Sequence, residues 1–286
     1  MKPFSIPVVA LGPGSQQEEE PLQYLSMPHT VRTFEGPSLP DADAVRSLGP
    51  ARAVLRRLLD AVREAAAGRA ALDLDLDPLD PDNLGLVDQV TGEGEVSARI
   101  ESESGSMRIQ ESVFAGVWRV RVFDTDNACV ADRLQIGELP PAIFRAGRSG
   151  SSAPRPLPEI PAGTASAPAL LAEIAEHLRI GTPQHVINLS LLPFSPEDGS
   201  CLDQALGRGT VSLLSRGYGN CRITATGISR LWWVQYFNSQ DALILNTLEI
   251  TDAPAVVRAA REDLEDSAER LADVLNWIDR VHGNGP

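Results

Sequence analysis

The sequence predicts an α+β protein built from two copies of one unit, each a helix, then a mainly antiparallel sheet, then a short helix. Three observations predict this class. The segments Leu72–Ala146 and Ile187–Ala260 align in order with a single one-residue gap. Both contain alternating apolar residues, which are typical of half-buried strands. Apolar residues at three-to-four spacing mark helices outside the strand regions. With 43% hydrophobic residues among 286, the chain can bury a sizeable core.

The duplication rests on identical residues that recur at matched positions. Asp88-Gln89 corresponds to Asp203-Gln204, Arg108-Ile109 to Arg222-Ile223, and Trp118 to Trp232. Further identical pairs are Leu74/Leu189, Leu76/Leu191, Gly92/Gly207, Gly94/Gly209, Ser97/Ser212, Gly105/Gly219, Val120/Val234, Phe123/Phe237, Leu134/Leu248 and Ile136/Ile250. Ordered identity over such a length indicates one structural unit present twice.

Composition divides the chain into four parts. Residues 1–43, rich in proline and containing the acidic run Glu18–Glu20, predict an extended N-terminal arm. Residues 44–146 form repeat copy 1 and residues 169–286 form repeat copy 2. Between them, residues 147–168 are dense in Gly, Ser, Ala and Pro, which predicts a linker.

The elements of each copy follow from periodicity. A helix is predicted between Pro50 and Gly68, because proline suits a first helical turn and glycine a stop. Copy 2 has a shorter predicted helix near Pro168–Leu178. The alternating segments Leu72–Leu76 and Ile187–Leu191 predict strands. Further predicted strands lie around 95–100, 107–111, 116–123 and 131–136 in copy 1, and around 210–214, 221–224, 231–237 and 242–250 in copy 2.

An additional helix is predicted at the C-terminus of copy 2. Residues 263–282 place Leu264, Leu271, Leu275 and Ile278 on one stripe, and acidic residues fill the first turn, as a helix N-terminus favours. Copy 1 has no equivalent segment.

Charge restricts the classes of partner. The net charge is −14, so contacts with nucleic acids and with anionic membrane surfaces are disfavoured. Three scattered cysteines fit a reducing compartment, and neither a signal peptide nor a membrane span is recognisable, so we expect a cytoplasmic protein.

No residues are predicted to be catalytic, cofactor-binding or metal-binding. Cys129, Cys201 and Cys221 stand where the other copy has Leu243, Leu86 and Met107, which predicts buried packing residues. The four histidines are scattered. Gly92-Glu93-Gly94 and Gly207-Arg208-Gly209 lack the dinucleotide-binding pattern and are interpreted as turns between strands.

The residues proposed for partner binding are aromatic. Trp232 and Phe237 recur in copy 1 and are interpreted as core, whereas Trp233 and Tyr236 replace Arg119 and Val122. Trp233 should point away from Trp232, because strand side chains alternate. Trp and Tyr are enriched at interface hot spots, so Trp233, Tyr236 and Tyr218 are the candidate contacts. Packing beneath the C-terminal helix is the alternative for Trp233 and Tyr236.

Several segments resemble the HupH/HyaF family of hydrogenase expression and formation proteins. They are the opening Ile6–Gln16, the turn Thr91–Ser97, the stretches Ile109–Val120 and Gly217–Gly227, and the tail Glu262–Ala268. The resemblance implies a cytoplasmic, non-enzymatic chaperone in maturation of a [NiFe] uptake hydrogenase. Its implied client is the iron–sulfur small-subunit precursor, bound before export, with other hydrogenase accessory proteins as further partners. It implies no cofactor and no ligand residues. The alternative is a maturation enzyme, or a protein that handles a metal or cluster, with a site not visible in the sequence.

Overall fold

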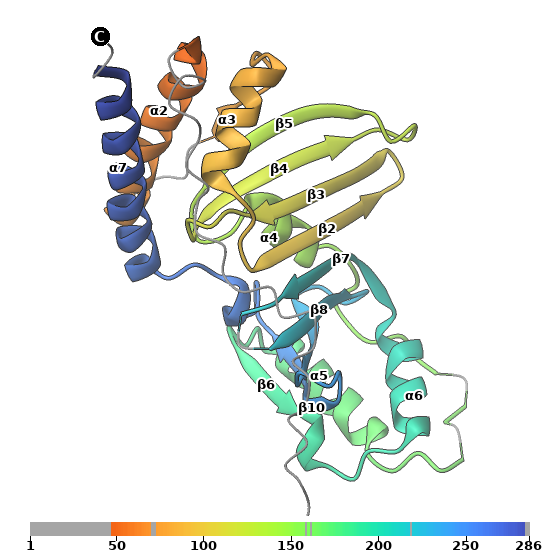
Figure 1. The fold of residues 1–286 in the computed structure, drawn as a ribbon. Helices are drawn as coiled ribbons and strands as arrows, with labels where there is room; N and C mark the ends of the chain where they lie inside the picture. Colours follow the sequence, from red (N-terminus) through yellow and green to blue (C-terminus); the bar gives the residue numbers. More distant parts are fainter. Residues whose placement is uncertain (1–46, 70–72, 158, 161, 218, 284–286) are drawn as a thin grey trace, which may run out of the picture. The chain divides into compact units, whose positions relative to one another are not determined.

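The computed structural model describes residues 47–69, 73–157, 159–160, 162–217 and 219–283 (Figure 1). The predicted N-terminal arm, residues 1–43, and Tyr218 lie outside the described residues. None of the described helices is both long enough and apolar enough to cross a membrane.

The two copies contain the same elements in nearly the same order. Copy 1 consists of α2 (Gly49–Ala66), β1 (Asp73–Asp75), α3 (Pro81–Thr91), β2 (Val96–Ser102), β3 (Gly105–Glu111), β4 (Val117–Phe123), β5 (Cys129–Ile136) and α4 (Pro141–Gly147). Copy 2 consists of α5 (Ala167–Arg179), β6 (His185–Asn188), the 3-10 turn η1 (Leu189–Leu191), α6 (Pro196–Leu206), β7 (Arg208–Ser215), β8 (Asn220–Thr226), β9 (Leu231–Phe237), β10 (Leu243–Ile250), the 3-10 turn η2 (Ala255–Val257) and α7 (Arg261–Gly283).

One ten-stranded sheet runs through both copies, in the order β1-β5-β4-β3-β2-β7-β8-β9-β10-β6, and its paired strands are antiparallel. The predicted α+β class and the shared topology are thus confirmed, because each copy repeats the same strand order outward from the junction. At that junction Ala98 pairs with Leu213, its own equivalent in the other copy. This register places a local two-fold axis between those two residues.

The glycine pairs end helices, so the interpretation of turns between strands was wrong. Gly92 and Gly207 follow α3 and α6 with φ of 53° and 64°, and each donates its N–H to the helix, at Asp88 and Asp203. Sequence analysis also missed both helices, whose local indicators were present. Asp80 and Ser195 are N-caps, and proline occupies the first turn of each helix.

A side chain at the start of α6 connects it to the preceding helix. The buried carboxylate of Asp198 accepts hydrogen bonds from the N–H groups of Ala165, Ser166 and Ala167 at the start of α5, at 3.0, 2.8 and 2.8 Å. Its second oxygen accepts from the N–H and hydroxyl of Ser195. In copy 1 the equivalent Asn83 accepts from Ala51 at the start of α2. In both copies, therefore, the free N–H groups at the start of the first helix are hydrogen-bonded by a side chain of the second helix, and that side chain occupies the same position in each copy.

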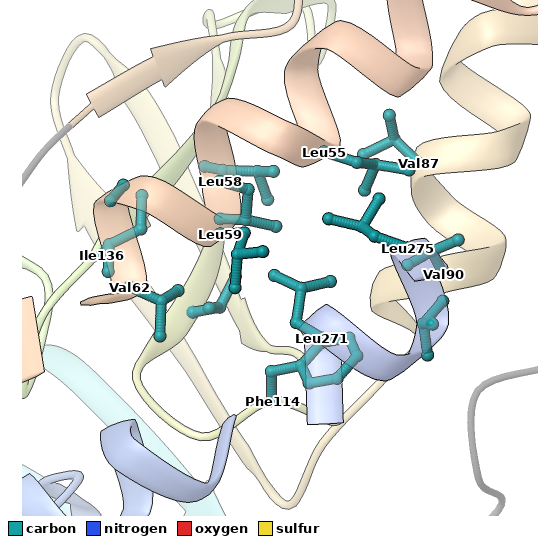
Figure 2. Packing of buried hydrophobic residues seen from close by; sticks show 14 of the residues in the cluster. Leu55, Leu58, Leu59, Val62, Val87, Val90, Phe114, Ile136, Leu271 and Leu275 are labelled. Carbon is teal, nitrogen blue, oxygen red and sulfur yellow. The ribbon is translucent and has the colours of Figure 1, made fainter. Parts of the chain in front are cut away.

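The outer strands on one face of the sheet are covered by helices. In copy 1, α2, α3 and α7 enclose a core that includes Leu58, Phe114 and Leu271 (Figure 2). In copy 2, α5 and α6 cover Leu231, Leu248 and Ile250. The predicted C-terminal helix is confirmed as α7, and it packs on α2 of copy 1.

The opposite face buries the two repeated tryptophans. Trp118 and Trp232 are fully buried, and their indole N–H groups donate to equivalent carbonyls, those of Gly137 and Thr251. Phe237 was expected in this core, but it lies five residues from Trp232 and therefore on the other face of β9, where it is half-buried. Its equivalent Phe123 is half-buried as well.

One of the three cysteines is not a core residue. Cys201 and Cys221 are buried as predicted, whereas Cys129 is exposed. Cys129 begins β5, and its equivalent Leu243 begins β10 and is 47% exposed. The aliphatic residue at the equivalent position is therefore a surface residue too, and aliphatic character alone did not indicate burial.

The first part of the predicted linker is hydrogen-bonded to copy 2. Ser151 exchanges backbone bonds with Gly227 and Ser229, and Arg155 donates its N–H to Ala205. Within residues 47–283 we expect a glutamate-specific protease to cut first at Glu159, because Glu159 is exposed and lies beyond these bonds. Mass spectrometry of the first fragments checks this, and initial cleavage inside either copy would contradict it.

Candidate binding groove

The centre of the helix-covered face is open and forms a groove of about 700 Å³. Its floor is made by β4, β3, β2, β7 and β8, so it crosses the junction between the copies, and Asp88 and Thr91 of α3 stand at one side. Five arginines line it, in a chain whose net charge is −14: Arg99, Arg108, Arg119, Arg121 and Arg222. Two acidic residues, Asp88 and Glu93, line it as well, so basic side chains outnumber acidic ones in the groove of an acidic protein.

Three of these arginines form a row across neighbouring strands. The sheet register pairs Arg99 of β2 with Arg108 of β3, and Arg108 with Arg121 of β4. Like charges placed directly opposite each other destabilise a sheet. Arg99 is paired with Glu101, and Arg121 lies 3.6 Å from Asp132. Arg108, the middle arginine, has no carboxylate partner among the described residues.

Arg119 is the buried anchor of the groove wall. Its guanidinium donates to Asp132 on β5 and to Asp88 on α3. Burial acts to lower the pKa of Arg119, but the two carboxylates outweigh it and hold that pKa above its ordinary value. Arg119 therefore connects α3 to the sheet, and its charge is already neutralised.

Arg108 and Arg222 are the groove arginines whose charge is not neutralised by a carboxylate among the described residues. They are equivalent in the two copies, both are exposed, and each lies over an equivalent phenylalanine, Phe123 at 4.1 Å and Phe237 at 4.5 Å. Arg108 also donates to Asn127 at 2.6 Å. Among the described residues, neither guanidinium has a carboxylate within ion-pair distance. The stacking fixes the side chains while leaving their charge available.

At the copy 2 end of this face a tryptophan stands where copy 1 has a buried arginine. Trp233 replaces Arg119, and its indole N–H donates at 2.6 Å to Asn246, which replaces Asp132. Trp233 is half-buried against the α5–α6 core, on the opposite face from Trp232 as predicted. It packs there and not beneath the C-terminal helix. With Asp203, Arg208 and Gln235 it lines a shallow pocket of about 340 Å³.

Tyr236 lies on the other face of β9 from Trp233. It packs against the core that contains Trp232, beside Cys221 on β8. Burial raises the pKa of Tyr236 to about 12 and that of the Cys221 thiol to about 11. The structure therefore does not bring Trp233 and Tyr236 together on one surface.

Sequence analysis identified neither the groove nor a second cluster on copy 2. The groove arginines recur at alternate strand positions, a pattern that a solvated strand face also gives. The histidines, interpreted as scattered, include two that meet: the rings of His177 and His185 stack with centroids 3.6 Å apart. Only the cross-strand register and the return of the chain after α5 place these residues together.

Comparisons with known proteins agree with the duplication. The family model described as "HupH hydrogenase expression protein, C-terminal conserved region" matches residues 48–153 and again residues 164–278. The chain is 47% identical to the hydrogenase expression/formation protein HoxQ of Cupriavidus necator over 285 residues, 98% of this chain and 100% of the relative. It is 43% identical to the hydrogenase expression/formation protein HupH of Rhodobacter capsulatus over 282 residues, 96% and 98% of the two chains.

A solved structure is also similar in sequence. The hydrogenase expression protein HupH from Thiobacillus denitrificans is 35% identical, and its match covers 40% of this chain and 96% of that chain with a TM-score of 0.36.

Proposed function

Because the chain belongs to the family of HupH hydrogenase expression proteins, we propose that it is a non-enzymatic chaperone of hydrogenase formation. In this proposal it binds the iron–sulfur small-subunit precursor in the cytoplasm before export. Other hydrogenase accessory proteins are further partners.

The observation that carries the proposal is the arginine-lined groove. Arg99 and Arg121 of the row have carboxylate partners, whereas Arg108 between them has none among the described residues, so a bound anionic group would compensate its charge. Two exposed guanidiniums, Arg108 and Arg222, are held by ring stacking with no carboxylate partner among the described residues. Such a surface favours an acidic client segment over a basic one.

The spacing of the two arginines defines the segment further. Arg108 lies on β3 and Arg222 on β8, with β2 and β7 between them. Three strand spacings amount to about 14 Å. The register places Thr224, not Arg222, in line with Arg108, so Arg222 is also offset by two residues, or about 7 Å, along the strand, and the two positions are about 16 Å apart. An extended chain covers that distance in about five residues. The client segment therefore carries two carboxylates separated by about five residues and crosses the junction between the copies.

Trp233 is the proposed apolar contact at the copy 2 end, and Tyr218 is the other proposed contact; Tyr236 packs against the opposite face of β9 and does not belong to this surface. We expect Trp233→Ala to weaken capture of the purified precursor by roughly thirtyfold, the effect of truncating an interface anchor worth about 2 kcal/mol. Titration of labelled precursor measures the affinity. Trp233→Phe, which retains most of the packing, is the companion variant, and circular dichroism monitors folding. Undiminished affinity in both folded variants would remove Trp233 from the contact surface.

The alternative, a protein that handles a metal or cluster, is favoured by a separate observation. Two histidines and a glutamate meet on copy 2, away from the groove lining.

A further inference from the structure

Three side chains of metal-ligating type converge where α5 meets β6. Glu173 and His177 are four residues apart on α5 and therefore share one helical face. His185 begins β6. One ligand atom from each of the three lies within 4.8 Å of the others.

The loop between α5 and β6 is held in the conformation that brings His185 back to the helix. Gly181, two residues after the end of α5, has a φ of 71° and donates its N–H to the carbonyl of Leu178. The guanidinium of Arg230 donates to the carbonyls of Thr182 and Pro183, at 3.3 and 2.7 Å, and is itself ion-paired with Asp252 at 3.0 Å. The cluster is therefore built by the fold and does not depend on chance meeting of mobile side chains.

The hydrogen bonds of the cluster orient its donor atoms. Nδ1 of His177 lies 3.0 Å from the hydroxyl of Thr182, which leaves Nε2 of that ring as the ligand atom. Metal-binding histidines have such a partner on their other nitrogen, because it fixes the ring and its tautomer. Nε2 of His185 lies 2.7 Å from the Glu173 carboxylate, and a metal ion would take the place of the proton between them. The side chains of His185 and Glu173 are 26% and 42% exposed, so solvent reaches the cluster.

The cluster is not a feature that the common fold of the two copies requires. The first helix of copy 1, α2, contains no histidine, and α7 packs against it. A requirement of the common fold would recur in both copies. The pairing of two imidazoles with a carboxylate is confined to copy 2.

We propose that Glu173, His177 and His185 bind one divalent first-row transition-metal ion. Two imidazoles and a carboxylate suit Zn²⁺ and its neighbours in that series, whereas Mg²⁺ and Ca²⁺ prefer oxygen ligands alone. Three protein ligands leave a coordination position open, as in sites where the ion contacts a substrate or exchanges. The site is distinct from the groove, and the proposal does not depend on the identity of the client.

The test uses the full chain purified without a histidine tag, with Zn²⁺ as the probe. Competition with a chromophoric chelator should give one equivalent bound to the unmodified chain and none to the His177→Ala/His185→Ala double variant. Thr182→Val, which removes only the partner of His177, should weaken binding about tenfold. Glu176→Gln is the matched control, because Glu176 lies on the same helix but pairs with Arg179. It should bind as the unmodified chain does.

Two results would overturn the proposal. One is a full chain that binds no more Zn²⁺ than the double histidine variant, which would mean adventitious binding or binding by the cysteines. The other is equal affinity in the Thr182→Val and Glu176→Gln variants. Circular dichroism checks that each variant is folded. If the double variant fails to fold, the Zn²⁺ affinities of the Thr182→Val and Glu176→Gln variants still test the proposal.

Discussion

Reversing the charge of Arg108 and Arg222 to glutamate is expected to abolish capture of the small-subunit precursor. Each guanidinium is exposed and stacked on a phenylalanine. A hydrogen bond to a charged group contributes about 1.5–3 kcal/mol, so losing two costs at least about 3 kcal/mol, or more than a hundredfold in affinity. Repulsion from the reversed charges adds to this. Titration of labelled precursor at low and moderate salt measures the loss.

The control must match the change in net charge. Arg57 on α2 and Arg145 on α4 are exposed arginines outside the groove lining. The Arg57→Glu/Arg145→Glu variant therefore makes the chain equally more acidic, and it should bind the precursor nearly as the unmodified chain does. Equal loss of binding in both double variants would show that only overall charge matters, and the groove would lose its proposed role.

Loss of folding does not account for the expected result. Arg108 lies between Arg99 and Arg121 in the row across the sheet, so glutamate at that position creates opposite-charge pairs on both sides. Opposite charges across neighbouring strands stabilise a sheet by a few tenths of a kcal/mol to about 1 kcal/mol. The Arg108→Glu chain should thus unfold at the same temperature as the unmodified chain, or slightly higher, while its affinity for the precursor falls.

The Asp198→Ala variant is expected to lower the free energy of unfolding by about 4 kcal/mol. Its carboxylate accepts from three N–H groups at the start of α5 and from Ser195. Removing the acceptor of these donors, of which only that of Ala167 is in a buried residue, costs up to about 1–3 kcal/mol for each group. Urea denaturation at neutral pH measures the change. Asp203→Ala, on the same helix but in an exposed pair with Arg208, should cost less than about 1 kcal/mol.

The contribution of Asp198 also depends on pH. Burial acts to raise its pKa, but the N–H donors of Ser195, Ala167 and Ser166 outweigh burial and hold that pKa well below the ordinary 3.8. The folded carboxylate therefore stabilises the protein fully above pH 3.8, and this stabilisation decreases as pH falls below that value. Asp198→Asn should remove this pH dependence at a smaller cost than alanine, since Asn83 serves the same position in copy 1. An Asp198→Ala chain as stable as Asp203→Ala would contradict the role of Asp198.

The parts of the fold that sequence analysis predicted are those specified locally or repeated. Trp118 and Trp232 recur and are fully buried, and the apolar stripe of α7 identified the last helix. The helices α3 and α6 were not predicted although their caps and prolines are present, because each is short and ends at a glycine pair that is also typical of a turn between strands. Phe237 was misplaced because recurrence was equated with burial, when an odd separation from Trp232 puts it on the other face.

The groove could not be predicted, because it depends on long-range pairing. Nothing near Arg99 in the sequence indicates that it neighbours Arg108 and Arg121, or that β2 pairs with β7 more than a hundred residues later. The histidine cluster has the same origin, since the return of the chain after α5 depends on Arg230. A sequence pattern indicates on which face of a strand or helix a residue lies, but the pairing of distant strands determines which residues become neighbours on that face.

The pairing of Ala98 with Leu213 has a consequence for ancestry and for the direction of binding. A chain holding a single copy would expose β2 as an edge strand, and two such chains could join there into a homodimer with identical halves. A symmetric homodimer binds an extended peptide equally well in either of its two directions. Tandem fusion into one polypeptide allows the halves to diverge, as at the equivalent positions Arg119 and Trp233. An extended segment bound across the proposed groove would therefore meet different side chains in its two directions.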